Sequence, residues 1–146
     1  MKIHIRRRSF QAGALTVELA LASIVFLTLV LAVLEFGRVM FLYTNLIEAT
    51  RYGARVATVC AQADTSVVKG KMLKYVSNIG LTAANITISY PLNTCSAVDC
   101  DPVTVQINNF SVPLSVPFVN LTFPLPKATT SVPSESLDSA NNAICQ

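Results

Sequence analysis

A single carboxylate, that of Glu18, stands inside the most apolar stretch of the sequence. Residues 14–34 read ALTVELALASIVFLTLVLAVL, and the polar side chains of this run are those of Thr16, Glu18, Ser23 and Thr28. If the run lies in a lipid bilayer, an ionised carboxylate at its centre costs about 3 kcal/mol, so such residues are usually paired or functional. Glu18 therefore needs a cationic partner, or a position close enough to the membrane surface for its carboxylate to reach water.

The other residues offer little catalytic chemistry. The only histidine is His4, there is no glycine-rich phosphate loop, and there is no close pair of carboxylates apart from Asp99 and Asp101. These two acids could hold a calcium ion, but acids in a loop before Pro102 more often only solvate a turn. We therefore predict that the protein is not an enzyme and has no metal or cofactor.

The apolar run is long enough to cross a membrane. The chain is 52% apolar overall, and a helix over residues 14–35 rises roughly 30 Å, the thickness of a bilayer's hydrocarbon core. The alternative is a helix buried in a soluble core, but the chain after about residue 62 is too small to enclose this run. We predict a transmembrane helix over residues 14–35, in contact with membrane lipid.

The residues before the run predict its orientation. Residues 1–13 form a leader in which Lys2, Arg6, Arg7 and Arg8 hold four of the eleven basic side chains, so the rest of the chain has seven against eight acidic ones. Because this basic segment is short and flanks the span, the positive-inside rule places it in the cytoplasm. Nucleic acid is not an expected partner, since a phosphate-binding patch should lie on the folded domain.

A break of small residues precedes the apolar run. In secretory signal peptides the apolar region is shorter and the cleavage site follows it. Here the break, Gln11-Ala12-Gly13, comes before the apolar residues, and GRVMFLYTN follows them. A cut at this break would leave the apolar helix on the mature protein, whereas a signal peptide is lost.

Three segments near the N-terminus carry a resemblance to a known family. Gly13, followed by ALTVE at residues 14–18, is similar to a prepilin peptidase site, with Glu as the fifth residue after the cut. LEFGR at residues 34–38 and ATRYGARVA at residues 49–57 are similar to the "EFGR" and "AAREGAR" stretches of TadE-like pseudopilins. These proteins belong to the tight-adherence (Flp) type IV pilus machinery.

The end of the chain resembles the same family more weakly. ATTS at residues 128–131, with Glu135, is similar to the family's last strand. The sequence departs from the family pattern at Leu19, where Phe is usual, in the lack of a proline within the span, and at Pro133, which would interrupt the last strand. The last of these departures bears on how the final strand pairs.

The resemblance implies that prepilin peptidase cuts the chain after Gly13 and that Glu18 serves in assembly. The cut would give Ala14 a free α-ammonium, and Ala14 and Glu18 lie one turn apart on the same face of a helix. In pilins this glutamate recruits an incoming subunit by pairing with the N-terminus of a neighbour. The pair can form within one subunit or between two, and the positive end of the helix dipole favours the carboxylate there.

The function that the resemblance implies is structural. We expect a minor pilin or pseudopilin that takes part in assembly of a type IVb (Tad/Flp) pilus for surface adherence. Its partners would be prepilin peptidase, other pilin or pseudopilin subunits and the inner-membrane assembly platform. It would cross the bacterial inner membrane once, with its C-terminal domain in the periplasm, or outside the cell after assembly. The alternative is a single-pass signal-anchored envelope protein whose small ectodomain binds a ligand or partner.

The helical pattern continues beyond the span. Apolar residues keep helical spacing to Cys60, so we predict one helix over residues 14–61, of which residues 36–62 form an amphipathic extension. In this extension Ala49, Gly53 and Ala57 recur every four residues. Small side chains at this spacing let another backbone approach closely. They favour close docking of the globular domain or of a neighbouring subunit.

Residues 63–146 predict a small α+β domain. Asp64 or Ser66 can cap a second helix, which Gly80 ends. Alternating patterns then predict three strands, at residues 86–90, 103–107 and 121–123. Prolines punctuate this region at Pro91, Pro102, Pro113, Pro117 and Pro124. The predicted fold is pilin-like: a long N-terminal transmembrane helix that extends into a small ectodomain with a second helix and an antiparallel sheet of three or four strands.

Four cysteines, Cys60, Cys95, Cys100 and Cys145, follow the span and would lie on its oxidising side, where disulfides form. Four cysteines allow three connectivities. We favour Cys95 with Cys100, closing a short loop, and Cys60 with Cys145, tying the tail to the end of the long helix. So small a domain usually needs such cross-links. Zinc is the rival, but it usually takes two close pairs of Cys or His ligands.

Overall fold

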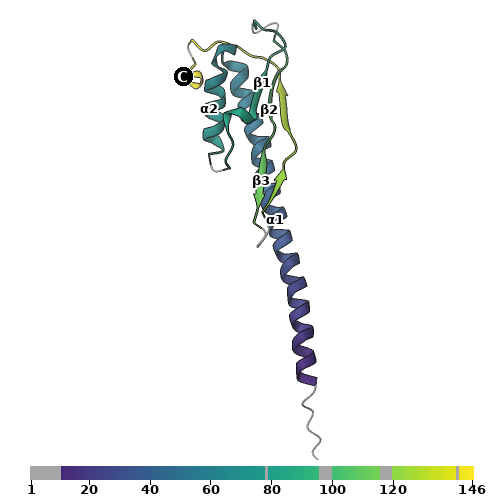
Figure 1. Ribbon diagram of the computed structural model, residues 1–146. Helices are drawn as coiled ribbons and strands as arrows, with labels where there is room; N and C mark the ends of the chain where they lie inside the picture. Colours follow the sequence, from purple (N-terminus) through teal and green to yellow (C-terminus); the bar gives the residue numbers. More distant parts are fainter. Residues whose placement is uncertain (1–10, 78, 96–99, 116–119, 141) are drawn as a thin grey trace, which may run out of the picture. The chain divides into compact units, whose positions relative to one another are not determined.

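The structure, a computed structural model, describes residues 11–77, 79–95, 100–115, 120–140 and 142–146, with side chains from Gly13 on. The chain divides into two compact units, residues 1–37 and 38–146, and each is described by itself. One helix, α1 (Gln11–Val59), contributes residues to both units (Figure 1). The basic side chains of the leader lie outside the described residues.

In the first unit α1 is an exposed apolar helix. No described side chain from Gly13 to Leu34 is buried, and Leu15, Phe26 and Val33 are 65%, 65% and 70% exposed. Leucine and alanine favour the helix, and no proline interrupts it. Among the described residues, this is the one helix long and apolar enough to cross a membrane. It is compatible with a single-pass membrane anchor, as predicted.

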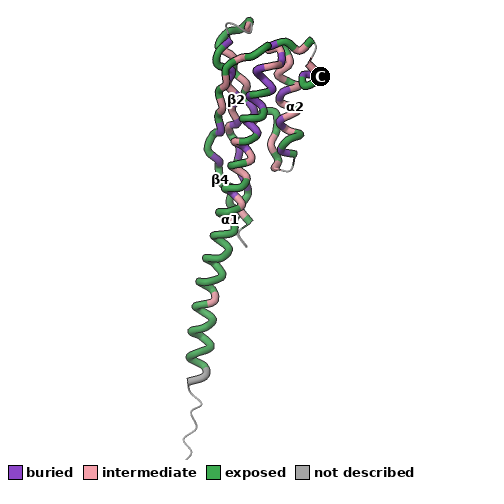
Figure 2. Tube along the Cα trace, turned by 180° about the vertical axis from the view of Figure 1, so that it is seen from behind, coloured by how far each residue is buried: buried purple, intermediate pink, exposed green. Residues whose placement is uncertain are grey.

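In the second unit α1 lies between a second helix and the strands, as both views of the chain show (Figures 1 and 2). The second helix is α2 (Thr65–Tyr75). Towards the sheet, the Oγ1 atoms of Thr50 and Thr130 lie 2.8 Å apart and share a hydrogen bond. Towards α2, the rings of Tyr52 and Tyr75 stack with their centroids 5.2 Å apart. The central position of α1 explains why its residues from Val39 on supply much of the core.

The strands form two antiparallel sheets, one of three strands in the order β1-β2-β5 and one that pairs β3 with β4. Their bounds are β1 Ile86–Ser89, β2 Val103–Ile107, β3 Ser111–Leu114, β4 Leu121–Pro124 and β5 Ala128–Val132. In β2 every second residue is buried, because alternate side chains of a strand point to the same face. The three short 3-10 turns are η1 Gln62–Asp64, η2 Ala83–Asn85 and η3 Ala143–Cys145. The α+β fold class is confirmed.

Two strands differ from the expectation. The segment predicted at residues 121–123 is a strand, β4, but it pairs with β3 and not with the main sheet. The prediction that Pro113 bounds a strand is wrong, since Pro113 lies inside β3 opposite Thr122. Both strands of a two-stranded sheet are edges, so a residue without an N–H is tolerated there. Pro133 leaves the last strand intact, because β5 ends one residue earlier, where Val132 pairs with Val103.

The second helix is shorter than predicted and is not capped as predicted. It ends at Tyr75, although the Val76 amide still donates to the Met72 carbonyl at 3.2 Å. Gly80 has φ +74°, a left-handed conformation that suits glycine, and so belongs to a turn beyond the helix. Asp64 occupies the N-cap position, but its side chain makes no capping hydrogen bond there. The 3-10 turn before α2 gives Asp64 a backbone conformation outside the usual extended N-cap range.

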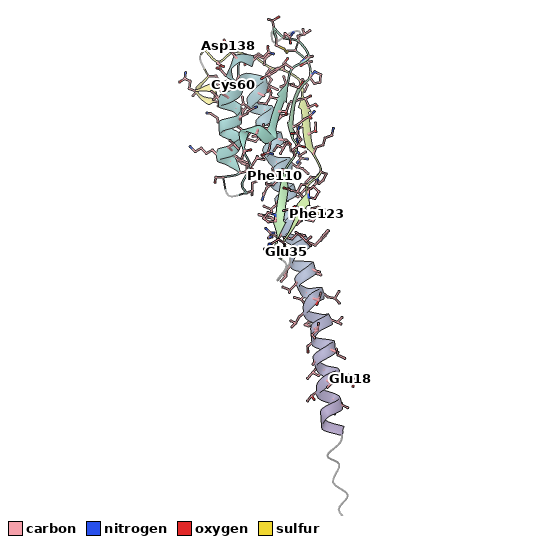
Figure 3. All side chains as sticks on the ribbon, in the orientation of Figure 1. Glu18, Glu35, Cys60, Phe110, Phe123 and Asp138 are labelled. Carbon is pink, nitrogen blue, oxygen red and sulfur yellow. A yellow bond between two sulfur atoms is a disulfide. The ribbon has the colours of Figure 1, made fainter. Side chains whose placement is uncertain are left out.

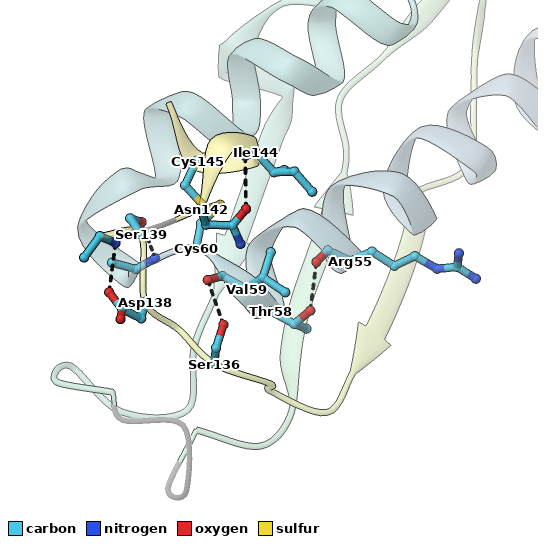
Figure 4. Close-up of a disulfide and its surroundings, with 12 residues drawn as sticks. Arg55, Thr58, Val59, Cys60, Ser136, Asp138, Ser139, Asn142, Ile144 and Cys145 are labelled. Carbon is cyan, nitrogen blue, oxygen red and sulfur yellow. Dashed lines mark hydrogen bonds between the residues drawn. A yellow bond between two sulfur atoms is a disulfide. The ribbon is translucent and has the colours of Figure 1, made fainter.

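The C-terminal segment returns to the end of α1 (Figure 4). The amides of Glu135 and Leu137 donate to the Thr58 carbonyl at 3.1 and 3.3 Å, and the Asp138 amide donates to the Val59 carbonyl at 3.1 Å. The last carbonyls of a helix have no intrahelical partner. The segment therefore supplies the hydrogen bonds that α1 lacks at its C-terminal end.

Two disulfides are present. Cys60 is joined to Cys145, with 5.5 Å between the Cα atoms, and Cys95 is joined to Cys100, with 5.2 Å. The presence of disulfides is thus confirmed, and the pairs are those that the sequence analysis favours. Cys60 and Cys145 are buried beside the end of α1. Residues 96–99, inside the smaller loop, lie outside the described residues.

We expect the two disulfides to contribute unequally to stability. The paired cysteines are 85 and 5 positions apart in sequence, and in the chain-entropy model loops of these lengths give about 4–5 and about 2 kcal/mol. The full chain in detergent should therefore lose more stability in Cys60→Ser/Cys145→Ser than in Cys95→Ser/Cys100→Ser. Guanidinium titration followed by tyrosine fluorescence measures the difference, because all four tyrosines lie in the second unit, at Tyr43, Tyr52, Tyr75 and Tyr90. Equal losses would contradict the expectation.

Candidate functional site

The predicted processing residues, Gly13 and Ala14, are exposed and lie near the start of α1. The Gly13 carbonyl, which belongs to the peptide bond that a cut would break, accepts a hydrogen bond from Thr16 Oγ1 at 2.8 Å. A Cβ placed on Gly13 would meet nothing within 4 Å. The described fold therefore does not require glycine at this position. A requirement for glycine would have to come from a molecule that binds this segment.

Three polar side chains of the apolar run bond to their own helix. Thr16 donates to the carbonyl of Gly13, and Ser23 and Thr28 donate to the carbonyls of Leu19 and Ile24, both at 2.7 Å. Hydroxyls that bond back to the preceding turn need no other partner, which makes them compatible with lipid. The sequence analysis treats them only as interruptions, although the spacing of three or four residues to a preceding carbonyl is a signal for this bond.

Glu18 differs from these three hydroxyl residues. Its side chain is exposed, and Figure 3 labels it on the outside of the helix. Within the described part of the chain it has no hydrogen-bond or ion-pair partner. It follows Ala14 by one helical turn, so the two residues lie on the same face of α1. Thr16, Ser23 and Thr28 therefore form hydrogen bonds to their own helix, and Glu18 does not.

The series Ala49, Gly53 and Ala57 lies in the core of the second unit. Ala49 and Ala57 are 0% exposed, and Gly53 is buried. A Cβ on Gly53 would lie 2.8 Å from Met72 Cγ and closer still to its sulfur, so the absence of a side chain admits α2 at this point. The structure uses the series for docking within the chain. A neighbouring subunit would not reach these buried residues.

Other groups that could do chemistry in the second unit are occupied or neutral. Asp99 lies outside the described residues, and Asp101 Oδ1 accepts a hydrogen bond from the Ser134 amide. The described residues contain no group of three His, Cys, Asp or Glu side chains that could hold a metal ion. Burial raises the pKa of Tyr90, and the Asp64 carboxylate raises it further. The Tyr90 phenol is therefore neutral at physiological pH.

One exposed ion pair lies on the amphipathic part of α1. Arg51 Nη1 lies 2.7 Å from Glu48 Oε1, and the two side chains are 61% and 53% exposed. Water screens such a pair, and its contribution to stability is about 0.5 kcal/mol or less. The pair belongs to a solvent-exposed face of the helix and does not indicate a binding or catalytic site.

Comparison with known families gives one match. The family described as TadE-like protein matches residues 13–55. The match begins at Gly13, includes Glu18 and lies wholly within α1. No curated protein and no solved structure matches the chain. The resemblance found in the sequence is confirmed over the helix that carries the candidate processing and assembly residues.

The role of Gly53 can be tested with a matched pair of glycine substitutions. Gly53 and Gly70 are both helical, but a Cβ on Gly70 would meet nothing within 4 Å. In Gly53→Val the new side chain should overlap Met72 and cost about 1–3 kcal/mol, whereas Gly70→Val shares the change in helix preference without the overlap. Thermal unfolding of both variants in detergent measures the difference. Equal midpoints would show that Gly53 is not needed for the packing of α2.

Proposed function

We propose, from the premise that residues 13–55 of this chain are TadE-like, that the protein is a structural minor pilin or pseudopilin of a Tad (Flp) type IVb pilus. Prepilin peptidase removes residues 1–13, and α1 holds the mature chain in the bacterial inner membrane until assembly. The second unit then lies on the periplasmic side. The protein acts by packing with other subunits at the assembly platform, for surface adherence, and carries out no catalysis.

The unsatisfied carboxylate of Glu18 carries this proposal. An isolated charge costs about 3 kcal/mol at the centre of the span and less towards its end, and the hydroxyls around Glu18 cannot pair with it because they donate to backbone carbonyls. A cut after Gly13 creates a cation, the α-ammonium of Ala14, at the depth where the carboxylate lies. Pairing of the two charges removes the cost, so a subunit gains stability when it aligns its N-terminus with a glutamate in the membrane.

The helix dipole favours pairing of the Ala14 ammonium with a carboxylate. The N-terminal end of a helix carries a partial positive charge, which stabilises a carboxylate and destabilises an ammonium at the same end. An ammonium on Ala14 therefore gains from any carboxylate that it can reach, its own or that of a neighbour. A neighbouring helix offers such a carboxylate without strain in the first turn, and this choice couples processing to assembly.

The space around Gly13 supports a processing role. Nothing in the described fold requires a residue without a side chain at position 13. A peptidase that must reach the Gly13 carbonyl carbon, however, gains access because glycine has no side chain. The bond is held in helix, with Thr16 Oγ1 on the Gly13 carbonyl. The peptidase must therefore open the first turn before it cuts.

We expect Gly13→Asp to block processing. The full chain is expressed in cells that contain the pilus machinery, and the N-terminus of the membrane-bound protein is sequenced. The natural chain and the control Gly70→Asp, an exposed helical glycine with open space around it, should begin at Ala14, and Gly13→Asp should retain the leader. A leader retained on the natural chain would contradict the proposal and support the signal-anchored binding protein.

Glu18→Gln should separate assembly from processing. The amide keeps the shape of the side chain and loses its charge, so the chain should still begin at Ala14, while association of subunits in the membrane should weaken by roughly a hundred-fold for a loss of about 3 kcal/mol. Sheared surface pili and cross-linked subunits are quantified. Glu48→Gln is the control, since Glu48 is exposed and pairs with Arg51. Normal pili with Glu18→Gln would disprove the role of this carboxylate.

A further inference from the structure

The hairpin of β3 and β4 is buried at its base and exposed towards its tip. At the base the Leu125 amide donates to the Phe110 carbonyl at 2.9 Å, and each of these two residues is 9% exposed. Farther along, Phe123 and Leu121 are 46% and 50% exposed, and every residue of β4 is exposed, as the colouring of Figure 2 shows. Figure 3 labels Phe110, at the base of the hairpin, and Phe123, farther along it.

The exposed side chains continue an apolar face. Phe123 pairs with Val112 and Leu121 pairs with Leu114, and residues directly opposite each other in an antiparallel pair point to the same side. Val112 is 3% exposed and belongs to the core. The face that begins in the core therefore extends beyond it, and its outer part is uncovered in the described chain.

Arg38 fixes the place of this face within the second unit. Arg38 Nη2 donates to the Pro113 carbonyl in the middle of β3. Arg38 is the first residue of this unit and follows Leu34, the last residue of the apolar run, by four positions of the same helix. Four helical residues rise about 6 Å. The uncovered apolar face therefore belongs to the part of the second unit that contains Arg38, its first residue.

The charges of the region match a lipid surface. No charged residue occurs from Val103 to Pro126; the residue that follows the hairpin in sequence, Lys127, and the residue that donates to its backbone, Arg38, are both basic. Apolar side chains sink into the boundary between headgroups and acyl chains, and basic ones are attracted to anionic lipids. The face itself consists of Leu, Phe and Val, without a charged side chain.

We propose that the β3–β4 hairpin rests on the lipid surface, with Phe123 and Leu121 at the boundary between headgroups and acyl chains. The contact holds the second unit against the membrane before any assembly takes place. The proposal rests only on the membrane anchor and does not depend on processing at Gly13 or on pairing by Glu18.

Tryptophan fluorescence tests the contact, since the natural sequence has no tryptophan. The full chain carrying Phe123→Trp or, separately, Leu121→Trp is reconstituted at low density into phosphatidylethanolamine and phosphatidylglycerol vesicles that contain brominated lipid. Leu27→Trp, in the apolar run, is the positive control. Tyr75→Trp is the negative control, because Tyr75 is 57% exposed and lies on α2, where its ring stacks on that of Tyr52.

The expected result is a blue-shifted emission for both hairpin variants and a loss of intensity with brominated lipid that approaches the loss for Leu27→Trp. Quenching no greater than that of Tyr75→Trp would overturn the proposal. A blue shift without quenching by lipid, which disappears when the protein is diluted among more vesicles, would also overturn it, because a second copy of the chain would then cover the face. A failed cut at Gly13 affects none of these readings.

Discussion

One continuous helix, α1, has to satisfy two unlike environments along its length, and the other elements are arranged around this requirement. In residues 14–34 nothing in the described chain covers the apolar side chains, so the hydroxyls of Ser23 and Thr28 turn back to carbonyls of their own helix. From Val39 on, the same helix supplies residues to a packed core. There the lack of a side chain on Gly53 admits α2, and Thr50 bonds to the sheet.

Much of this arrangement could be predicted from local sequence signals. Periodic apolar residues without a proline predict a helix over residues 14–61, and the observed helix is Gln11–Val59. Strand β3 could not be predicted, because Pro113 usually ends a strand; it is tolerated where no neighbouring strand needs its amide and where Arg38 binds its carbonyl. The end of α2 at Tyr75 could not be predicted either. Val76 is buried and keeps the helical spacing of apolar residues, although it lies beyond the helix.

Some features of the candidate site could be predicted from residue type, and others only from the geometry of the fold. The identities of Gly13 and Glu18 predict their chemistry, because a carboxylate in an apolar run needs a partner whatever the fold. The sequence left two roles open for Ala49, Gly53 and Ala57, and only packing could decide between them: these residues are buried against their own domain. The hydrogen bonds from the Thr16, Ser23 and Thr28 hydroxyls to their own helix could be established only from the structure, because they depend on side-chain rotamers. These bonds leave Glu18 as the unmatched group.

The cross-link between Cys60 and Cys145 has a mechanical consequence. Without it, tension between the anchor helix and the C-terminus would pull out the segment between two cysteines that are 85 positions apart, which reaches about 290 Å when fully extended. With it, the load passes from the end of α1 through the disulfide to the last residues, and residues 61–144 are bypassed. A pull along the chain therefore acts on α1 and cannot extend the segment that the disulfide closes.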